Sequence, residues 1–211
     1  MSQDGPKLPI AKLWAQLIQE CRPKLVITTG TAGGIGPGMQ LGDVVVAPTV
    51  RFDCAKTFAS APFHDAQYPC SKVKSPAATV TTPLFAANTS HLPPAARPPR
   101  VVVRPMAGVS SADVVTTDFF AFDDSTNEYK LEGLGAAVEM GDAVLGLVIS
   151  QMAAGTAPKW VAVRNASDPR IDATGLTPRE AAQKAAQIYE RFGYWTTIPS
   201  AITCWAVVLN N

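Results

Sequence analysis

The sequence has few of the residues on which many active sites depend. Its only histidines, His64 and His91, stand in proline-rich surroundings without a partner at ligand spacing. We therefore predict no metal site and no Ser-His-Asp catalytic triad. The four cysteines are widely spaced and form no Cys-X-X-Cys pair. This pattern favours a reduced, cytoplasmic chain over a disulfide-stabilised one.

A large excess of either charge is also absent. The chain carries 18 Lys and Arg against 17 Asp and Glu, and it has no basic run interleaved with aromatic residues. Since nucleic acids are bound through clustered cations, we predict no nucleic-acid partner. No apolar stretch reaches the roughly 18 residues of a membrane span, and residues 1–7 lack the cationic-then-apolar pattern of a signal peptide. We therefore predict no membrane partner.

The composition fits a folded α/β domain. With 211 residues, 47% of them apolar, the chain is long enough to bury a substantial core. Short β-branched runs alternate with stretches of helical periodicity, which predicts one three-layer α/β domain over residues 1–211. The predicted strands are 25–29, 44–47, 101–104, 136–140 and 160–165. The predicted helices are 8–21, a short one at 129–131, 142–154, 177–191 and, after a break at 193–195, a buried terminal helix at 198–209.

Two parts of the chain depart from a regular βαβ order. The helix at 8–21 precedes the first predicted strand, whereas a crossover helix normally follows a strand, so we expect the usual first β-α unit to be absent. Eight prolines fall between Pro62 and Pro99. We interpret residues 50–100 as an insertion or active-site flap with one short strand near 78–81. A domain boundary is the competing interpretation.

A glycine-rich stretch follows the first predicted strand. Six glycines fall within residues 30–42, and a second β-branched run begins at Val44. Such a loop can direct its N–H groups at an anion or at sugar hydroxyls. It can equally be a tight turn between neighbouring strands, and both interpretations stay open on this stretch alone.

Polar residues collect after three of the predicted strands, at 28–31, at 139–142 and at 164–168. Because ligands of α/β sheets bind beyond the carboxyl ends of strands, these clusters are candidates for one cleft. A desolvated Asp168 would have a raised pKa and could serve as a general acid near neutral pH; the alternative is that Ser167 and Asp168 cap a turn. Glu139 lies at an apolar junction between a predicted strand and a predicted helix, where an unpaired carboxylate would be costly. It therefore needs a partner, either a ligand hydroxyl or Arg164.

Five motifs together resemble a known family. They are Thr28-Thr-Gly-Thr-Ala-Gly-Gly34, Leu41-Gly-Asp-Val-Val-Val46, Gly108-Val-Ser-Ser-Ala-Asp113, Val138-Glu-Met140 and Val163-Arg-Asn-Ala-Ser-Asp168. In order and spacing they resemble the purine/uridine phosphorylase family, and most closely its methylthioadenosine/S-adenosylhomocysteine nucleosidase-like members. The resemblance covers roughly residues 10–190. It implies a three-layer α/β/α domain with a mixed, partly barrel-like sheet and a homo-oligomer.

The resemblance also implies a chemistry, the cleavage of the N-glycosidic bond of a purine nucleoside through an oxocarbenium-like transition state. By this resemblance Asp168 protonates the departing base, Ser167 holds Asp168, and Met140 lies under the sugar. The candidate catalytic residues are Asp168, Ser167 and Arg164. The candidate substrate-binding residues are Thr31, Ala32 and Gly33 on the ribose side, Ser111 and Val115 near the base, and Glu139, Met140 and Asp142. No cofactor is implied, although phosphate would be a co-substrate of a phosphorylase.

Three departures from the family pattern shape the expected activity. Gly141 stands where the family has a second Glu that grips the ribose hydroxyls, and Asp142, one position later, is a possible substitute whose default role is helix capping. Thr28 stands where many phosphorylases carry an Arg, so hydrolysis is preferred over phosphorolysis. The family's first strand has no counterpart before residue 8. A non-catalytic nucleoside-binding relative and a fragment of a longer phosphorylase are the alternatives.

Overall fold

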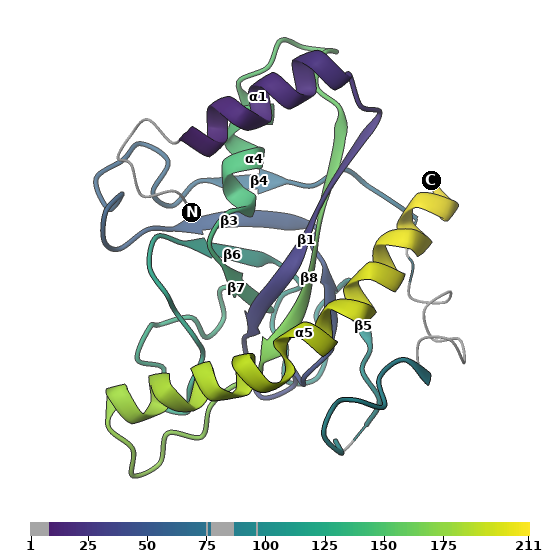
Figure 1. The fold of residues 1–211 in the computed structure, drawn as a ribbon. Coiled ribbons are helices and arrows are strands. Elements are labelled where there is room, and N and C mark those ends of the chain that lie inside the picture. The colour runs from purple at the N-terminus through teal and green to yellow at the C-terminus, as the bar shows by residue number, and fades with distance from the viewer. Residues whose placement is uncertain (1–8, 75, 77–86, 96) are drawn as a thin grey trace.

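Two long parallel strands form the centre of the molecule, whose computed structural model describes residues 9–74, 76, 87–95 and 97–211. They are β1 (Leu25–Gly34) and β8 (Lys159–Asp168), and they pair along nearly their whole length (Figure 1). The other strands are β2 (Val44–Val46), β3 (Thr49–Asp53), β4 (Gln67–Pro69), β5 (Val101–Val102), β6 (Val114–Thr117) and β7 (Ala137–Glu139).

The eight strands form one sheet in the order β4-β3-β6-β7-β1-β8-β2-β5. Parallel pairs such as β1 with β8 and β6 with β7 stand beside antiparallel pairs such as β1 with β7 and β2 with β8. The predicted mixed sheet is therefore confirmed.

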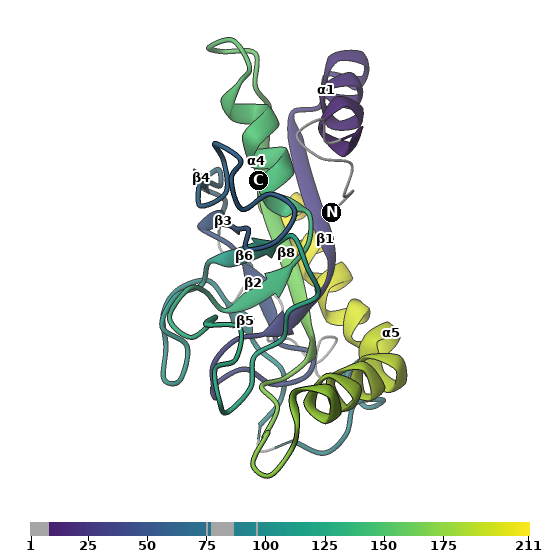
Figure 2. The same ribbon diagram turned by 90° about the vertical axis from the view of Figure 1, so that its left-hand side faces the viewer.

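Helices cover both faces of this sheet because its central strands are apolar on both sides. Along β8, Trp160 and Ala162 join the core that contains α4 (Asp142–Ser150) and part of α1 (Pro9–Cys21). Val161 and Val163 join the other core, beneath α5 (Pro178–Asn210). Successive strand residues point to opposite faces, and Figure 2 shows α4 and α5 on opposite sides of β1. The predicted three-layer α/β/α architecture is confirmed.

The long helix α5 starts as predicted and then differs from the prediction. Thr177 and Glu180 form a capping box with Pro178 in the first turn, which satisfies free N–H groups of that turn. The predicted break at Gly193 is wrong, because the helix continues to Asn210 with Pro199 inside it. Gly costs about 1 kcal/mol and Pro about 3 kcal/mol inside a helix. Packing against β8 and β1 outweighs these costs.

A buried polar network fastens the middle of α5 to the sheet. The Asn165 side-chain amide donates to the Thr196 hydroxyl at 2.7 Å, and the Ser200 hydroxyl donates to the Asn165 amide oxygen at 2.8 Å. The end of the helix is less buried than predicted, since Trp205 and Leu209 are 65% and 64% exposed. By length and composition α5 passes the test for a membrane-spanning helix, as core helices of soluble proteins also do, and 39% of its most apolar stretch is buried.

Three short strands, β3, β4 and β6, were not predicted. Strands β3 and β4 lie in the segment interpreted as an insertion or flap, and they extend the sheet beyond β6. The strand predicted near 78–81 lies outside the described residues. No helix forms at 129–131, where one was predicted: a turn ends at residue 129, and 130–131 are irregular. Ahead of β1, the described part of the chain contains α1 and no strand.

The proline-rich segment is tied to the sheet through a fully buried carboxylate, that of Asp43. Both Arg97 Nη atoms donate to the Asp43 side chain, at 2.7 and 2.5 Å, and the Arg100 backbone N–H donates to it at 2.9 Å. Arg97 also donates to the Gly38 carbonyl at 2.8 Å. Since a bidentate Arg–carboxylate pair is among the stronger polar contacts, it fixes the end of this segment beside the glycine-rich stretch.

We predict that Arg97→Met lowers the free energy of unfolding by about 3 kcal/mol, because it leaves the buried Asp43 carboxylate without its cation. Urea unfolding followed by circular dichroism measures this change. The control is Arg104→Met, which alters an exposed side chain and should change stability by less than about 0.5 kcal/mol. Equal losses in both variants would contradict the anchoring role of Arg97.

Candidate active site

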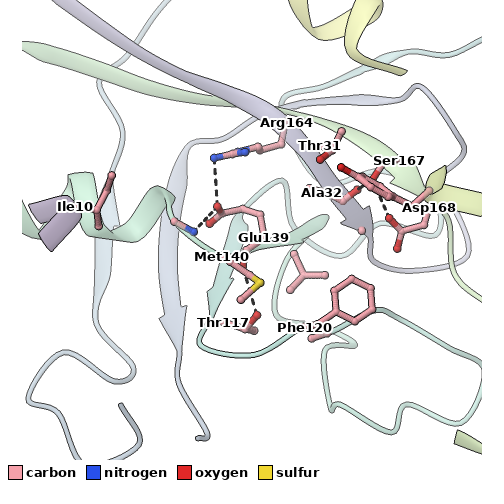
Figure 3. A pocket seen from close by; sticks show the side chains of 15 residues that line it. Ile10, Thr31, Ala32, Thr117, Phe120, Glu139, Met140, Arg164, Ser167 and Asp168 are labelled. Carbon is pink, nitrogen blue, oxygen red and sulfur yellow. Dashed lines mark hydrogen bonds and ion pairs between the residues drawn. The ribbon is translucent and has the colours of Figure 1, made fainter. Parts of the chain in front are cut away.

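A cavity of about 520 Å³ opens where the ends of β1, β7 and β8 meet. Figure 3 shows Arg164, Glu139 and Met140 on one side of it and Ser167 and Asp168 on the other. Its walls also include residues of α1, α5 and the segment after β6. The lining residues are Ile10, Thr31, Ala32, Gly33, Thr117, Phe120, Ala121, Val138, Glu139, Met140, Gly141, Arg164, Ser167, Asp168 and Tyr189.

The carboxyl group of Asp168 is buried at the end of β8, only 7% exposed. Its Oδ1 lies 2.8 Å from the Ser167 hydroxyl, which also lies 3.2 Å from the Ala32 carbonyl oxygen. Burial raises the pKa of Asp168 to about 6, although the hydrogen bond from Ser167 acts in the opposite sense. A carboxyl group in this state can hold a proton near neutral pH and deliver it into the cavity.

Arg164 is held by two carboxylates from the junction of β7 and α4. Its Nε donates to Asp142 Oδ2 at 2.7 Å, its Nη2 contacts Asp142 Oδ1, and the same Nη2 lies 3.2 Å from Glu139 Oε2. These contacts raise the pKa of Arg164 further above its already high value, so the guanidinium is permanently charged. Its Nη1 donates to no group in the described part of the chain, which leaves two N–H bonds for a ligand.

Glu139 is held by three hydrogen bonds from the protein and by an ion pair with Arg164. Its Oε1 accepts from the Thr116 hydroxyl and from the Asp142 backbone N–H at 2.9 Å, and its Oε2 accepts from the Gly141 N–H at 2.5 Å and faces Arg164. Burial and the Asp142 carboxylate raise the pKa of Glu139 to about 7, although Arg164 and the hydrogen bonds from Thr116 and Asp142 act in the opposite sense. Three hydrogen bonds and one ion pair thus hold this carboxyl group in place.

The glycine-rich stretch serves these side chains. Strand β1 continues through Gly34, so residues 30–34 belong to the sheet and do not form the loop that was predicted. A Cβ atom on Gly30 would lie 2.6 Å from Arg164 Nη1, and one on Gly33 would lie 3.0 Å from Asp168 Oδ2. Beyond the strand, the Gly36 N–H donates to the carboxylate of Asp123 at 2.8 Å. The anion bound by the backbone N–H of Gly36 is therefore a side chain of the protein, the carboxylate of Asp123.

The structure brings eight of the eleven predicted site residues together around the cavity. They are Thr31, Ala32, Gly33, Glu139, Met140, Arg164, Ser167 and Asp168. Ser111, Val115 and Asp142 do not line it, for three different reasons. The Ser111 hydroxyl accepts from the Asp113 N–H, the Val115 side chain packs against Val138 and Ile35, and Asp142 is fully buried against Arg164.

Seven lining residues were not predicted. Thr117 is the last residue of the unpredicted strand β6, Phe120 and Ala121 follow this strand, and Val138 and Gly141 flank predicted residues. Ile10 and Tyr189 come from helices α1 and α5. One available signal was the pair Phe119-Phe120, one residue after the β-branched run 114–117; in the structure Phe120 is 56% exposed.

The fold and the cavity define an enzyme of the nucleosidase or nucleoside phosphorylase class. The family model of the phosphorylase superfamily matches residues 9–192, and the chain belongs to this superfamily. The resemblance inferred from the five motifs is thus confirmed.

Solved structures of similar fold include three enzymes from bacteria. The methylthioadenosine/S-adenosylhomocysteine nucleosidase of Colwellia psychrerythraea 34H in complex with adenine is 19% identical, with a TM-score of 0.63 over 97% of this chain and 74% of that one. The methylthioadenosine/S-adenosylhomocysteine nucleosidase of Neisseria meningitidis in complex with methylthio-immucillin-A is 22% identical, with a TM-score of 0.60 over 96% of this chain and 76% of that one. The futalosine hydrolase of Helicobacter pylori is 17% identical, with a TM-score of 0.61 over 95% of this chain and 74% of that one.

We predict that Asp168→Asn lowers kcat/KM for nucleoside cleavage by about 10²- to 10⁴-fold, the usual contribution of a general acid. The acid must carry its proton, so the wild-type kcat/KM should be constant below pH 6 and fall as pH rises through about 6. Kinetics of base release between pH 4.5 and 8.5 measure both effects.

The same substitution should leave the fold intact. The folded-state pKa of Asp168 is raised from 3.8 to about 6, so stability is lost between these two pH values and stays lost above pH 6. The neutral amide should therefore not lower the melting temperature at pH 8. Asp65→Asn changes a carboxylate that is 71% exposed and should alter neither kcat/KM nor its pH profile. A wild-type profile in Asp168→Asn would contradict the assignment of the acid.

Proposed function

We propose that this protein hydrolyses the N-glycosidic bond of a purine nucleoside. The single observation that carries the proposal is the pair of opposed groups in one cavity. A buried carboxyl group with a raised pKa, Asp168, faces the side where Arg164 is held between two carboxylates (Figure 3). One side can release a proton and the other carries charge, as an acid-catalysed glycosidic cleavage requires.

The reaction follows from this placement. The base lies toward Asp168, which donates its proton to N7 of the purine while the bond between C1′ and N9 breaks and its electron pair goes to the base. The sugar lies over Met140, and its developing positive charge is stabilised by the negative charge of the Glu139 side. Water bound by the free Nη1 of Arg164 then attacks C1′, and the proton it loses returns Asp168 to its acid form.

Water is favoured over phosphate as the nucleophile by the charge of the cavity. Among the described residues that line it, Arg164 is the one cation, and Asp142 and Glu139 already neutralise it. A phosphate dianion would have to approach without a free positive charge, and burying an unpaired charge is costly. Thr28, at the position of the phosphorylase Arg, also lies outside the cavity lining.

The relatives support a purine as the base. Two nucleosidases of similar fold are in complex with adenine and with methylthio-immucillin-A. The apolar part of the cavity, with Ile10, Phe120 and Val138, suits a planar base and an apolar 5′ substituent. A homo-oligomer located in the cytoplasm remains our prediction.

The test measures the release of adenine from adenosine and from methylthioadenosine in reaction buffers with and without about 20 mM phosphate. Chromatography separates the base from the nucleoside. We expect equal rates in the two buffers, with free ribose as the sugar product of adenosine and free methylthioribose as that of methylthioadenosine. Strict dependence on phosphate with formation of the corresponding sugar 1-phosphate would identify a phosphorylase. Tight binding of both nucleosides without turnover would identify a non-catalytic binding protein.

A further inference from the structure

We infer that a second cavity, at the opposite ends of β1 and β8, binds a phosphate monoester with an apolar body. This cavity of about 810 Å³ lies where the C-terminal end of α1, the loop after α4 and the starts of β1 and β8 come together (Figure 1). Cavities of this size hold small organic ligands in many proteins. The inference does not depend on the proposed function, because it concerns a different site.

The second cavity is remote from the candidate active site. Lys159, which lines it, is the first residue of β8, and Asp168 is the last. A strand rises about 3.3 Å per residue, so these two residues are about 30 Å apart. None of the described residues that line the cavity around Asp168 also lines the second cavity.

Three cations line the second cavity, namely Arg22, Lys24 and Lys159. The Lys159 N–H donates to the Lys24 carbonyl at 3.2 Å, so these two residues are neighbours at the starts of adjacent strands. None of the three cations forms an ion pair with another described residue, and no Asp or Glu is among the described residues of the lining. An anion bound between like charges removes their repulsion.

The helix ends beside the second cavity offset only part of this positive charge. The C-terminal end of a helix carries about half a negative charge, and both α1 and α4 end here. Two helix ends against three cations leave a charge of about +2. A phosphate monoester matches this charge, because its second pKa is about 6 and it is largely a dianion at pH 7.5.

Arg22 occupies a backbone position that suits glycine better. Its φ is 46°, and its N–H donates to the Ile18 carbonyl at 3.0 Å where α1 ends. A side chain is strained at such a φ, and glycine is the usual residue at this kind of helix end. The chain places an arginine here in spite of the strain. Its guanidinium is suited to bind a phosphate group through two hydrogen bonds.

The remaining wall of the second cavity is largely apolar. It includes Ile18, Met152 and Pro158 together with three alanines. Inorganic phosphate would leave these side chains in contact with water, whereas the organic part of an ester would cover them. The cavity therefore favours a phosphate ester over phosphate itself.

The test is calorimetric titration of the full chain at pH 7.5 with phenyl phosphate, in which an apolar ring carries a phosphate dianion. Benzenesulfonate has a similar ring with one negative charge, and inorganic phosphate lacks the ring. Phenyl phosphate should bind at least about threefold more tightly than either. A smaller difference from either ligand, or no binding at about 10 mM phenyl phosphate, would overturn the inference. Loss of binding in the presence of adenine would overturn it as well, because the ligand would then occupy the candidate active site.

Substitutions of the cations separate binding from folding. Arg22→Gly relieves the strained φ, so the melting temperature should be unchanged or higher, whereas the affinity for phenyl phosphate should fall at least about fivefold. Lys159→Gln should weaken binding in the same sense. The control is Lys12→Gln, which changes an exposed cation of α1 outside the lining and should alter the affinity by less than about twofold. Wild-type affinity in Arg22→Gly and Lys159→Gln, or an equal loss in Lys12→Gln, would contradict the inference.

Discussion

The burial of one guanidinium group, that of Arg164, is the constraint on which the arrangement of the site depends. A buried charge is tolerated only when opposite charges and hydrogen bonds surround it. Asp142 and Glu139 supply them from the junction of β7 and α4. The ion cluster therefore spans β1, connecting β8 to the strand and helix on its other side. It also requires Gly30 to be a glycine, because any side chain there would meet Arg164 Nη1.

How much of the fold is readable from the sequence depends on whether an element is specified locally. The amphipathic helix α1, the apolar runs of β1 and β8 and the start of α5 carry their signals in neighbouring residues, and each was predicted. Strands β3 and β4 carry no such signal. They are short, they lie among prolines, and they exist because β6 offers them a place at the end of the sheet. Likewise, α5 passes through Gly193 and Pro199 because Asn165, far away in sequence, binds Thr196 and Ser200.

The candidate site divides in the same way. The clustering of residues at the ends of β1, β7 and β8 could be predicted from the sequence, because strand ends of one sheet meet at a common edge. The contributions of Ile10 and Tyr189 depend on where two helices cross the sheet, and no local pattern specifies that. Val115 was placed near the base by resemblance, but the twofold alternation of β6 directs it into the core with Val138. Its neighbour Thr116 takes part instead, as a donor to Glu139.

The two buried acids of the cavity differ in how many donors they receive, and this difference assigns their roles. Asp168 accepts one hydrogen bond, from a hydroxyl that can also turn toward the Ala32 carbonyl, so nothing strongly opposes its protonation. Glu139 faces four donors, three of which are N–H groups that cannot reverse their direction. These donors fix the position of Glu139 beside Arg164. The single hydrogen bond to Asp168 comes from a hydroxyl that can reorient, so this carboxyl group can take up and release its proton without breaking a fixed contact.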